Sequence, residues 1–147
     1  MEERSYYMYY DRTLVIDELP DGTWRGSLLD WDTGEFHPAD EHVLRRVRGA
    51  STTADISGID EDEFVLRTEL VREDRLTGDG PVFALYAAIE TLYARKDAER
   101  RRFTDEEFEV ITHIRRTTFA LWEQEAARRA RGEQPTFTAR RKTSSDD

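Results

Sequence analysis

One short segment of the sequence gathers several side chains that could bind a metal ion. His37, Asp40, Glu41 and His42 lie within six residues, and imidazole with carboxylate is a ligand set that transition metals accept. A metal site needs three or four such groups directed at one ion. We expect a helix to begin between the two histidines, which separates them, and Asp40 and Glu41 suit the positive end of its dipole. The sequence therefore predicts no metal site.

A second candidate for chemistry is His113, which follows Glu109 by four residues and could form an acid–base pair with it. On a helical wheel His113 faces away from the apolar residues of its segment, so an ordinary surface contact is expected. Gly78 and Gly80 resemble a phosphate-binding turn, but Asp79 between them would repel an anion. The chain has no cysteine and no nucleophile-elbow or phosphate-loop motif. We predict no catalytic residue and no cofactor.

The charge of the chain is unevenly distributed. Residues 1–75 hold 19 Asp and Glu against 9 Arg and Lys, whereas residues 76–147 hold 13 of each, so the net charge of −10 belongs to the first half. Such asymmetry bears on partners and solubility more than on fold. The N-terminus has no signal-peptide pattern, and no stretch reaches the ~20 apolar residues that span a bilayer. We expect a cytoplasmic protein without a membrane segment.

The acidic half predicts an antiparallel β meander. Aromatic and β-branched residues favour strands, and Pro-Asp-Gly and Asp-Thr-Gly segments favour tight turns. The predicted order is a strand over 6–16, a turn at 20–23, a strand over 24–31, a turn at 32–35 and a short strand at 35–37.

Two helices are predicted to follow the meander. Pro38 and Gly49 mark the ends of the first, over about 38–48, although residues 42–48 could also pair as a strand. Residues 51–58 are polar and are expected to form a loop. Asp60 with Glu63 resembles a helix start, which favours a helix over 61–73. The alternation of apolar residues there also permits a strand.

The second half predicts an antiparallel helical hairpin. Apolar residues recur at helical spacing over 81–94, and Thr104 with Glu107 forms a capping-box pattern before a helix over 105–131. We therefore predict an α+β fold: a meander with a short helix, packed against a helical hairpin. The predicted division is an acidic β-rich part over 1–75, the hairpin over 76–132 and a flexible tail over 133–147, with one structural domain over 5–132.

The apolar residues of the helix over 105–131 spread over about half of its circumference, more than one buried face requires. We expect this helix to pack on two sides, against helix 81–94 and against the sheet or a second copy. Arg115 falls inside the apolar arc. Its aliphatic stem is expected to pack against apolar neighbours while its guanidinium reaches the solvent-exposed rim of the packed face. An intersubunit salt bridge or a buried ligand contact is the alternative.

A run of aromatic residues, Tyr6 to Tyr10, offers another possible surface. Neighbours on a strand point to opposite faces, so either both faces of this strand are covered or one of them binds a partner. The predicted interface residues are Tyr7, Tyr9, Trp24, Arg115, Phe119 and Trp122.

The leading hypothesis is a non-enzymatic protein-interaction protein, a regulator or adaptor, that forms a homo-oligomer and binds a protein of unknown identity. One alternative is an acidic mimic of nucleic acid, such as a phage inhibitor of a nucleic-acid-handling protein. Another is a small-molecule enzyme with a pocket near Arg115 and Tyr86. Direct nucleic-acid binding is disfavoured, because acidic residues flank the arginine clusters.

Overall fold

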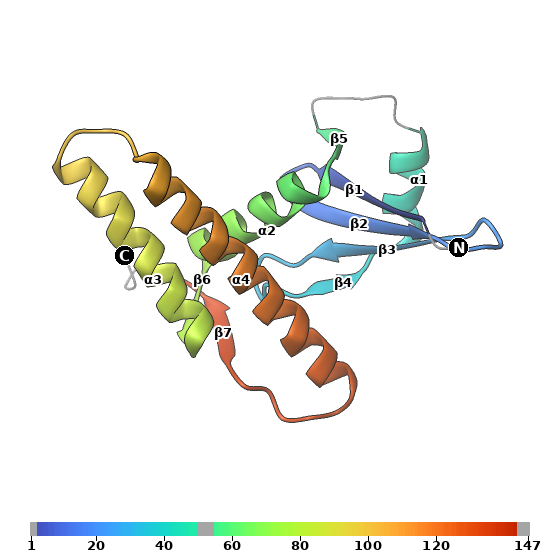
Figure 1. Cartoon of the computed structure of the whole chain (residues 1–147). Helices are drawn as coiled ribbons and strands as arrows, with labels where there is room; N and C mark the ends of the chain where they lie inside the picture. Colours follow the sequence, from blue (N-terminus) through green and yellow to red (C-terminus); the bar gives the residue numbers. More distant parts are fainter. Residues whose placement is uncertain (1–2, 50–54, 144–147) are drawn as a thin grey trace. The chain divides into compact units, whose positions relative to one another are not determined.

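The computed structural model describes residues 3–49 and 55–143 (Figure 1). The chain divides into two compact units at Arg72 and Glu73, and each unit is described by itself. The first contains an antiparallel sheet with helices, and the second contains a helical hairpin with a two-stranded sheet. The predicted α+β class is confirmed.

The first unit is built on a five-stranded antiparallel sheet in the order β4-β3-β2-β1-β5. The strands are β1 (Glu3–Tyr9), β2 (Arg12–Glu18), β3 (Trp24–Leu29), β4 (Phe36–Pro38) and β5 (Ile56–Ile59). The predicted meander is confirmed by β1 to β4, and the turns after β2 and β3 lie at the predicted positions. In the first of these turns, the Gly22 amide donates to the Leu19 carbonyl at 2.8 Å, and in the second the Gly34 amide donates to the Asp30 carbonyl at 2.9 Å.

The sheet differs from the prediction in two places. The expected strand over 6–16 is a hairpin, in which Tyr9 pairs with Arg12 and the chain turns at Tyr10 and Asp11. Tyr10 has a φ of 56°, a left-handed conformation that aromatic residues rarely adopt, so residue type did not signal the turn. The expected loop over 51–58 ends in β5, which pairs with β1; residues 51–54 lie outside the described part.

One face of the sheet packs against α1 (Glu41–Gly49). Val43, Leu44 and Val47 of this helix form one buried cluster with Leu14 and other residues of the sheet. The helix starts three residues later than predicted, because Asp40 is its cap: the Asp40 carboxylate accepts a hydrogen bond from the Val43 amide at 3.0 Å.

The other face of the sheet packs against α2 (Glu61–Arg75). Asp60 accepts from the Glu63 amide at 2.8 Å, as the predicted helix start requires. The Phe64 ring lies 4.6 Å from the Tyr6 ring, and the hydroxyls of Thr13 and Thr68 share a buried hydrogen bond of 2.7 Å. The helix over 61–73 is therefore confirmed, and the strand alternative is wrong.

The second unit contains β6 (Leu76–Asp79), α3 (Pro81–Ala98), α4 (Asp105–Ala130) and β7 (Thr138–Arg141). The predicted hairpin is confirmed: α3 and α4 lie side by side and run in opposite directions (Figure 1). The capping box is present. Thr104 accepts from the Glu107 amide at 3.1 Å, and the Glu107 carboxylate accepts from the Thr104 amide at 2.9 Å.

The structure corrects the prediction of a flexible tail over 133–147. Residues 138–141 form β7, which pairs with β6, and Phe137 is buried. The pairing depends on Gly78, since a Cβ there would lie 2.0 Å from the Thr138 carbonyl oxygen. Phe137 and Ala139 are too few apolar residues in a polar segment to give a periodic signal, so the sequence did not reveal this strand. Residues 144–147 lie outside the described part.

The substitution Phe137→Ala tests whether this segment belongs to the folded unit. Phe137 packs against Trp122 at 4.9 Å and Phe83 at 6.1 Å between ring centroids. Truncating such a buried ring costs about 3 kcal/mol, so urea unfolding followed by circular dichroism should show that loss. A free energy of unfolding within error of the wild type would mean that the segment contributes nothing to the fold.

Candidate functional site

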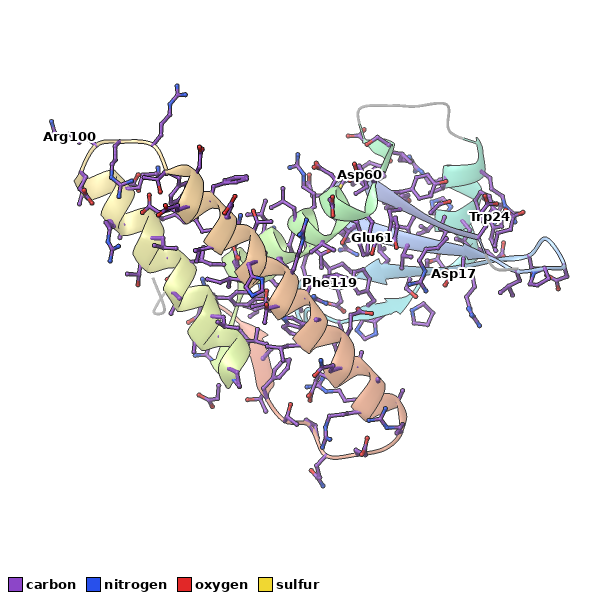
Figure 2. The ribbon with its side chains drawn as sticks, viewed as in Figure 1. Asp17, Trp24, Asp60, Glu61, Arg100 and Phe119 are labelled. Atoms are coloured by element: carbon purple, nitrogen blue, oxygen red, sulfur yellow. The ribbon has the colours of Figure 1, made fainter. Side chains whose placement is uncertain are left out.

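The three predicted interface residues of the first unit are half-buried. Tyr7, Tyr9 and Trp24 all pack against the cluster beneath α1, and Trp24 is labelled in Figure 2. The Trp24 ring is also covered by the Arg48 guanidinium, 4.3 Å from its centroid. Since Tyr6 packs against α2, both faces of the aromatic strand are covered within this unit. Of the two explanations that the sequence left open, this supports internal packing.

Arg115 is buried in the second unit and takes part in an ion pair. Its Nε donates to Glu73 Oε1 at 3.2 Å and its Nη2 donates to Glu73 Oε2 at 3.3 Å. The Tyr93 hydroxyl accepts a further bond at 3.3 Å. Burial alone would lower the pKa of Arg115, but these bonds raise it on balance. The expectation that its guanidinium reaches the rim is wrong, because a carboxylate partner is available inside the same unit.

Trp122 and Phe119 have different surroundings. Trp122 is 3% exposed, lies in the core of the second unit, and donates from Nε1 to the Tyr86 hydroxyl at 2.9 Å. It therefore offers no surface to a partner, which corrects the prediction for this residue. Phe119, labelled on α4 in Figure 2, is half-buried. Its role as an interface residue stays a prediction.

The sequence did not reveal a buried ion pair in the first unit. Glu69 and Arg72 are almost fully buried, and Arg72 Nη1 donates to Glu69 Oε2 at 2.8 Å. The Arg72 Nε also donates to the Gly34 carbonyl oxygen at 2.9 Å, so the pair fastens α2 to the turn between β3 and β4. Residues three apart on a charged helix usually form surface pairs, so spacing alone could not predict this burial.

Several acidic residues of the first unit have a structural role. Asp17 forms an ion pair with Arg4, with a 2.7 Å bond from Nε, and this bond lowers the pKa of Asp17. Four other aspartates accept a backbone N–H within their own turn or helix cap: Asp21 from Thr23, Asp30 from Asp32, Asp40 from Val43 and Asp60 from Glu63.

The histidine segment shows no arrangement for a metal. His37 Nε2 lies 3.5 Å from Asp30 Oδ2 and 3.3 Å from the Thr33 hydroxyl. Over residues 3–49 and 55–143, no group of three His, Cys, Asp or Glu side chains is placed to hold an ion. Over the same residues, no helix is both long and apolar enough to cross a membrane.

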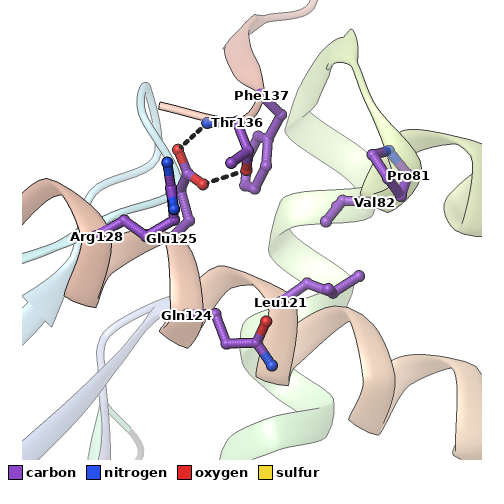
Figure 3. Close-up of a pocket in the computed structure, with 8 residues that line it drawn as sticks. All are labelled: Pro81, Val82, Leu121, Gln124, Glu125, Arg128, Thr136 and Phe137. Atoms are coloured by element: carbon purple, nitrogen blue, oxygen red, sulfur yellow. Dashed lines mark hydrogen bonds between the residues drawn. The ribbon is translucent and has the colours of Figure 1, made fainter. Parts of the chain in front are cut away.

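A pocket of about 280 Å³ opens at the base of the hairpin (Figure 3). Neither Arg115 nor Tyr86, the residues suggested for a small-molecule site, lines it. Its apolar and polar lining comes from α3, α4 and the segment before β7. The lining residues are Pro81, Val82, Leu121, Gln124, Glu125, Arg128, Thr136 and Phe137.

Glu125 is the one carboxylate in the lining of this pocket, and its oxygens are already engaged. Oε1 accepts from the Thr136 amide at 2.8 Å and from Arg129 Nε at 3.3 Å, and Oε2 accepts from the Thr136 hydroxyl. Burial would raise the pKa of Glu125, but the bonds from Thr136 and Arg129 lower it on balance. A general acid or base at neutral pH needs a pKa near the working pH. Glu125 instead anchors the segment before β7.

The hairpin is held together by one stripe from each helix. The buried residues of α3 are Val82, Tyr86 and Ile89, and those of α4 are Ile111, Arg115, Thr118, Trp122 and Glu125. Their spacings of four and three are those of helices packed side by side. We call these residues the seam.

A second stripe runs along each helix, one residue before the seam. On α3 it contains Leu85 and Ala88, and Leu92 continues the same spacing; on α4 it contains Val110, Ile114, Thr117 and Leu121. In an antiparallel pair, stripes shifted by one residue in the same direction turn to the same face of the hairpin. We call these seven residues the outer stripe. None of them is charged.

The outer stripe remains partly accessible. Val110 is 49% exposed, Ala88 is exposed, and Leu85, Leu92 and Ile114 are half-buried. Leu121 packs against the core and lines the pocket, so the pocket lies at one end of the stripe. The predicted wide apolar arc of the last helix therefore corresponds to two stripes, of which the seam is buried and the other is not.

The other end of the hairpin carries aromatic residues and a charge network. Phe108 is 62% exposed, and the Tyr93 and Phe103 rings meet edge to face at 4.8 Å. Arg100 lies in the loop between the helices (Figure 2). Arg101 donates to both carboxylate oxygens of Glu107, which lowers the pKa of Glu107 to about 2.

Comparison with known proteins gives no match: no family model, curated protein or solved structure corresponds to this chain.

The substitution Arg115→Met tests the buried pair. Removing one member of a buried ion pair leaves the other charge without compensation and costs about 3 kcal/mol, measured by urea unfolding. The double variant Glu73→Leu with Arg115→Met should recover part of this loss, because neither charge is then left alone. Equal stability of the wild type and the single variant would contradict the account of this pair.

The pH dependence of stability tests the role of Glu107. Its pKa of about 2 lies below the ordinary value of 4.5, so its contribution is complete above about pH 4.5 and is lost as the pH falls toward 2. Compared with the wild type, Glu107→Gln should lose less melting temperature between pH 5 and about 2.5. Parallel melting curves for the two proteins would contradict this role.

Proposed function

We propose that this protein is a non-enzymatic interaction protein, a regulator or adaptor, that self-associates through the hairpin of α3 and α4. The observation that carries the proposal is the outer stripe, a row of uncharged residues on both helices that is not buried between them. Its exposed and half-buried members include Val110, Ile114 and Leu92.

The chemistry of the outer stripe supports a protein partner. Charged residues make up 37% of the chain, so seven uncharged positions on one face depart from its usual surface. An apolar patch on one face is typical of a protein–protein interface. Its spacing of three and four residues also repeats that of the seam, so a second helical hairpin could pack there by the same geometry.

The remaining hypotheses have less support. A small-molecule enzyme would need convergent polar groups with shifted pKa values near neutrality, whereas Glu125 in the pocket is held ionised by its own chain. An acidic mimic would need carboxylates displayed for a partner. Several aspartates of the first unit serve instead as caps and turn acceptors.

The substitution Val110→Asp tests self-association. An unpaired charge in an apolar interface costs about 3 kcal/mol, which alone raises the dissociation constant about 100-fold, and a symmetric dimer of the variant would bury two such charges. Light scattering after size exclusion, over a range of concentrations, should show the wild type as a dimer and the variant as a monomer. Because Val110 is half exposed, the melting temperature of the monomer should change little.

Ala87→Asp is the matched control. Ala87 is exposed on α3, and helical spacing turns it away from the outer stripe. This variant should remain dimeric. A wild type that is monomeric at every concentration would contradict the proposed function.

A further inference from the structure

We infer that two copies of this chain pack α4 against α4 in opposite directions, with Val110 of each copy seated in the pocket at the hairpin base of the other. This inference rests on the proposed function and adds the occupant, the orientation and the residue that enters the pocket. It joins two features of the same face: an exposed apolar side chain near one end and a pocket near the other.

The spacing of residues along α4 carries the inference. Thr117 lies near the middle of the outer stripe. Val110 precedes it by seven residues, and Gln124, which lines the pocket, follows it by seven. When two identical helices cross in opposite directions at Thr117, residues at equal distances on either side of the crossing meet. Val110 of one copy is therefore brought to the pocket of the other.

Charge sets the orientation. Glu106 precedes Thr117 by eleven residues and Arg128 follows it by eleven, and both flank the outer stripe. In the antiparallel arrangement Glu106 of each copy lies near Arg128 of the other. In a parallel arrangement Glu106 would meet Glu106, and Arg128 would meet Arg128, which is unfavourable.

The pocket suits this occupant. Pro81, Val82, Leu121 and Phe137 provide an apolar lining, and Glu125 keeps its own hydrogen bonds without a ligand. A branched apolar side chain can contact this apolar lining without displacing the hydrogen bonds of Glu125. Each copy supplies one Val110 and one pocket, so the twofold arrangement closes and stops at a dimer.

Crosslinking single-cysteine variants tests the arrangement, since the natural chain has no cysteine. Thr117→Cys should crosslink to itself with a short bismaleimide, because the crossing brings the two copies together there. A mixture of Val110→Cys and Gln124→Cys should give a mixed product. Glu123→Cys is the matched control: it is exposed on α4 and turns away from the outer stripe, so it should stay uncrosslinked.

The outcomes separate this inference from the proposed function. Crosslinking at Thr117→Cys and between Val110→Cys and Gln124→Cys, above the Glu123→Cys background, supports the inference. A dimer in which Thr117→Cys crosslinks no more than Glu123→Cys overturns the inference and leaves the proposed function standing. A chain that is monomeric by light scattering overturns both.

Discussion

A pair of helices can bury only one stripe of each against the other, and this constraint governs the second unit. The seam uses the stripe that contains Tyr86 and Trp122. Whatever apolar surface remains must face solvent, another part of the protein or another molecule. The outer stripe is the apolar surface that the seam does not bury. It is uncharged and repeats the spacing of the seam because each helix carries two apolar stripes instead of one.

Polar residues inside the two units depend on a related constraint, that buried charges need partners. Arg115 lies in the seam beside apolar layers, and Glu73 with the Tyr93 hydroxyl satisfies it. In the first unit Glu69 and Arg72 satisfy each other and the Gly34 carbonyl. These ion pairs and hydrogen bonds fix the positions of the helices that carry them. Because their hydrogen-bonding atoms are engaged within the chain, they give no support to catalysis.

Local signals in the sequence predicted much of the fold. The Thr104–Glu107 capping box, the turn at Gly22 and the start of α2 at Asp60 each depend on a few neighbouring residues, and all are present. Features that depend on distant residues were missed. The strand pairing of β7 needs Gly78 on another segment, and the turn at Tyr10 needs a backbone conformation that its residue type disfavours.

The candidate site was predicted only in outline. The wide apolar arc of the last helix indicated two packing sides, but it could not say which residues α3 would cover. Trp122 was therefore assigned to an interface although it belongs to the seam, and Val110 was overlooked although it is exposed. Arg115 was expected at the rim because its partner Glu73 lies 42 residues away. Whether a residue on this helix is buried or exposed depends on which stripe forms the seam, and the sequence alone does not show this.

Sedimentation equilibrium of the unmodified chain is the most direct test of the central claim that the outer stripe is an interface between two copies. We expect a species of twice the 17.2 kDa chain mass that dissociates on dilution. A single species at the mass of one chain across all concentrations would contradict it.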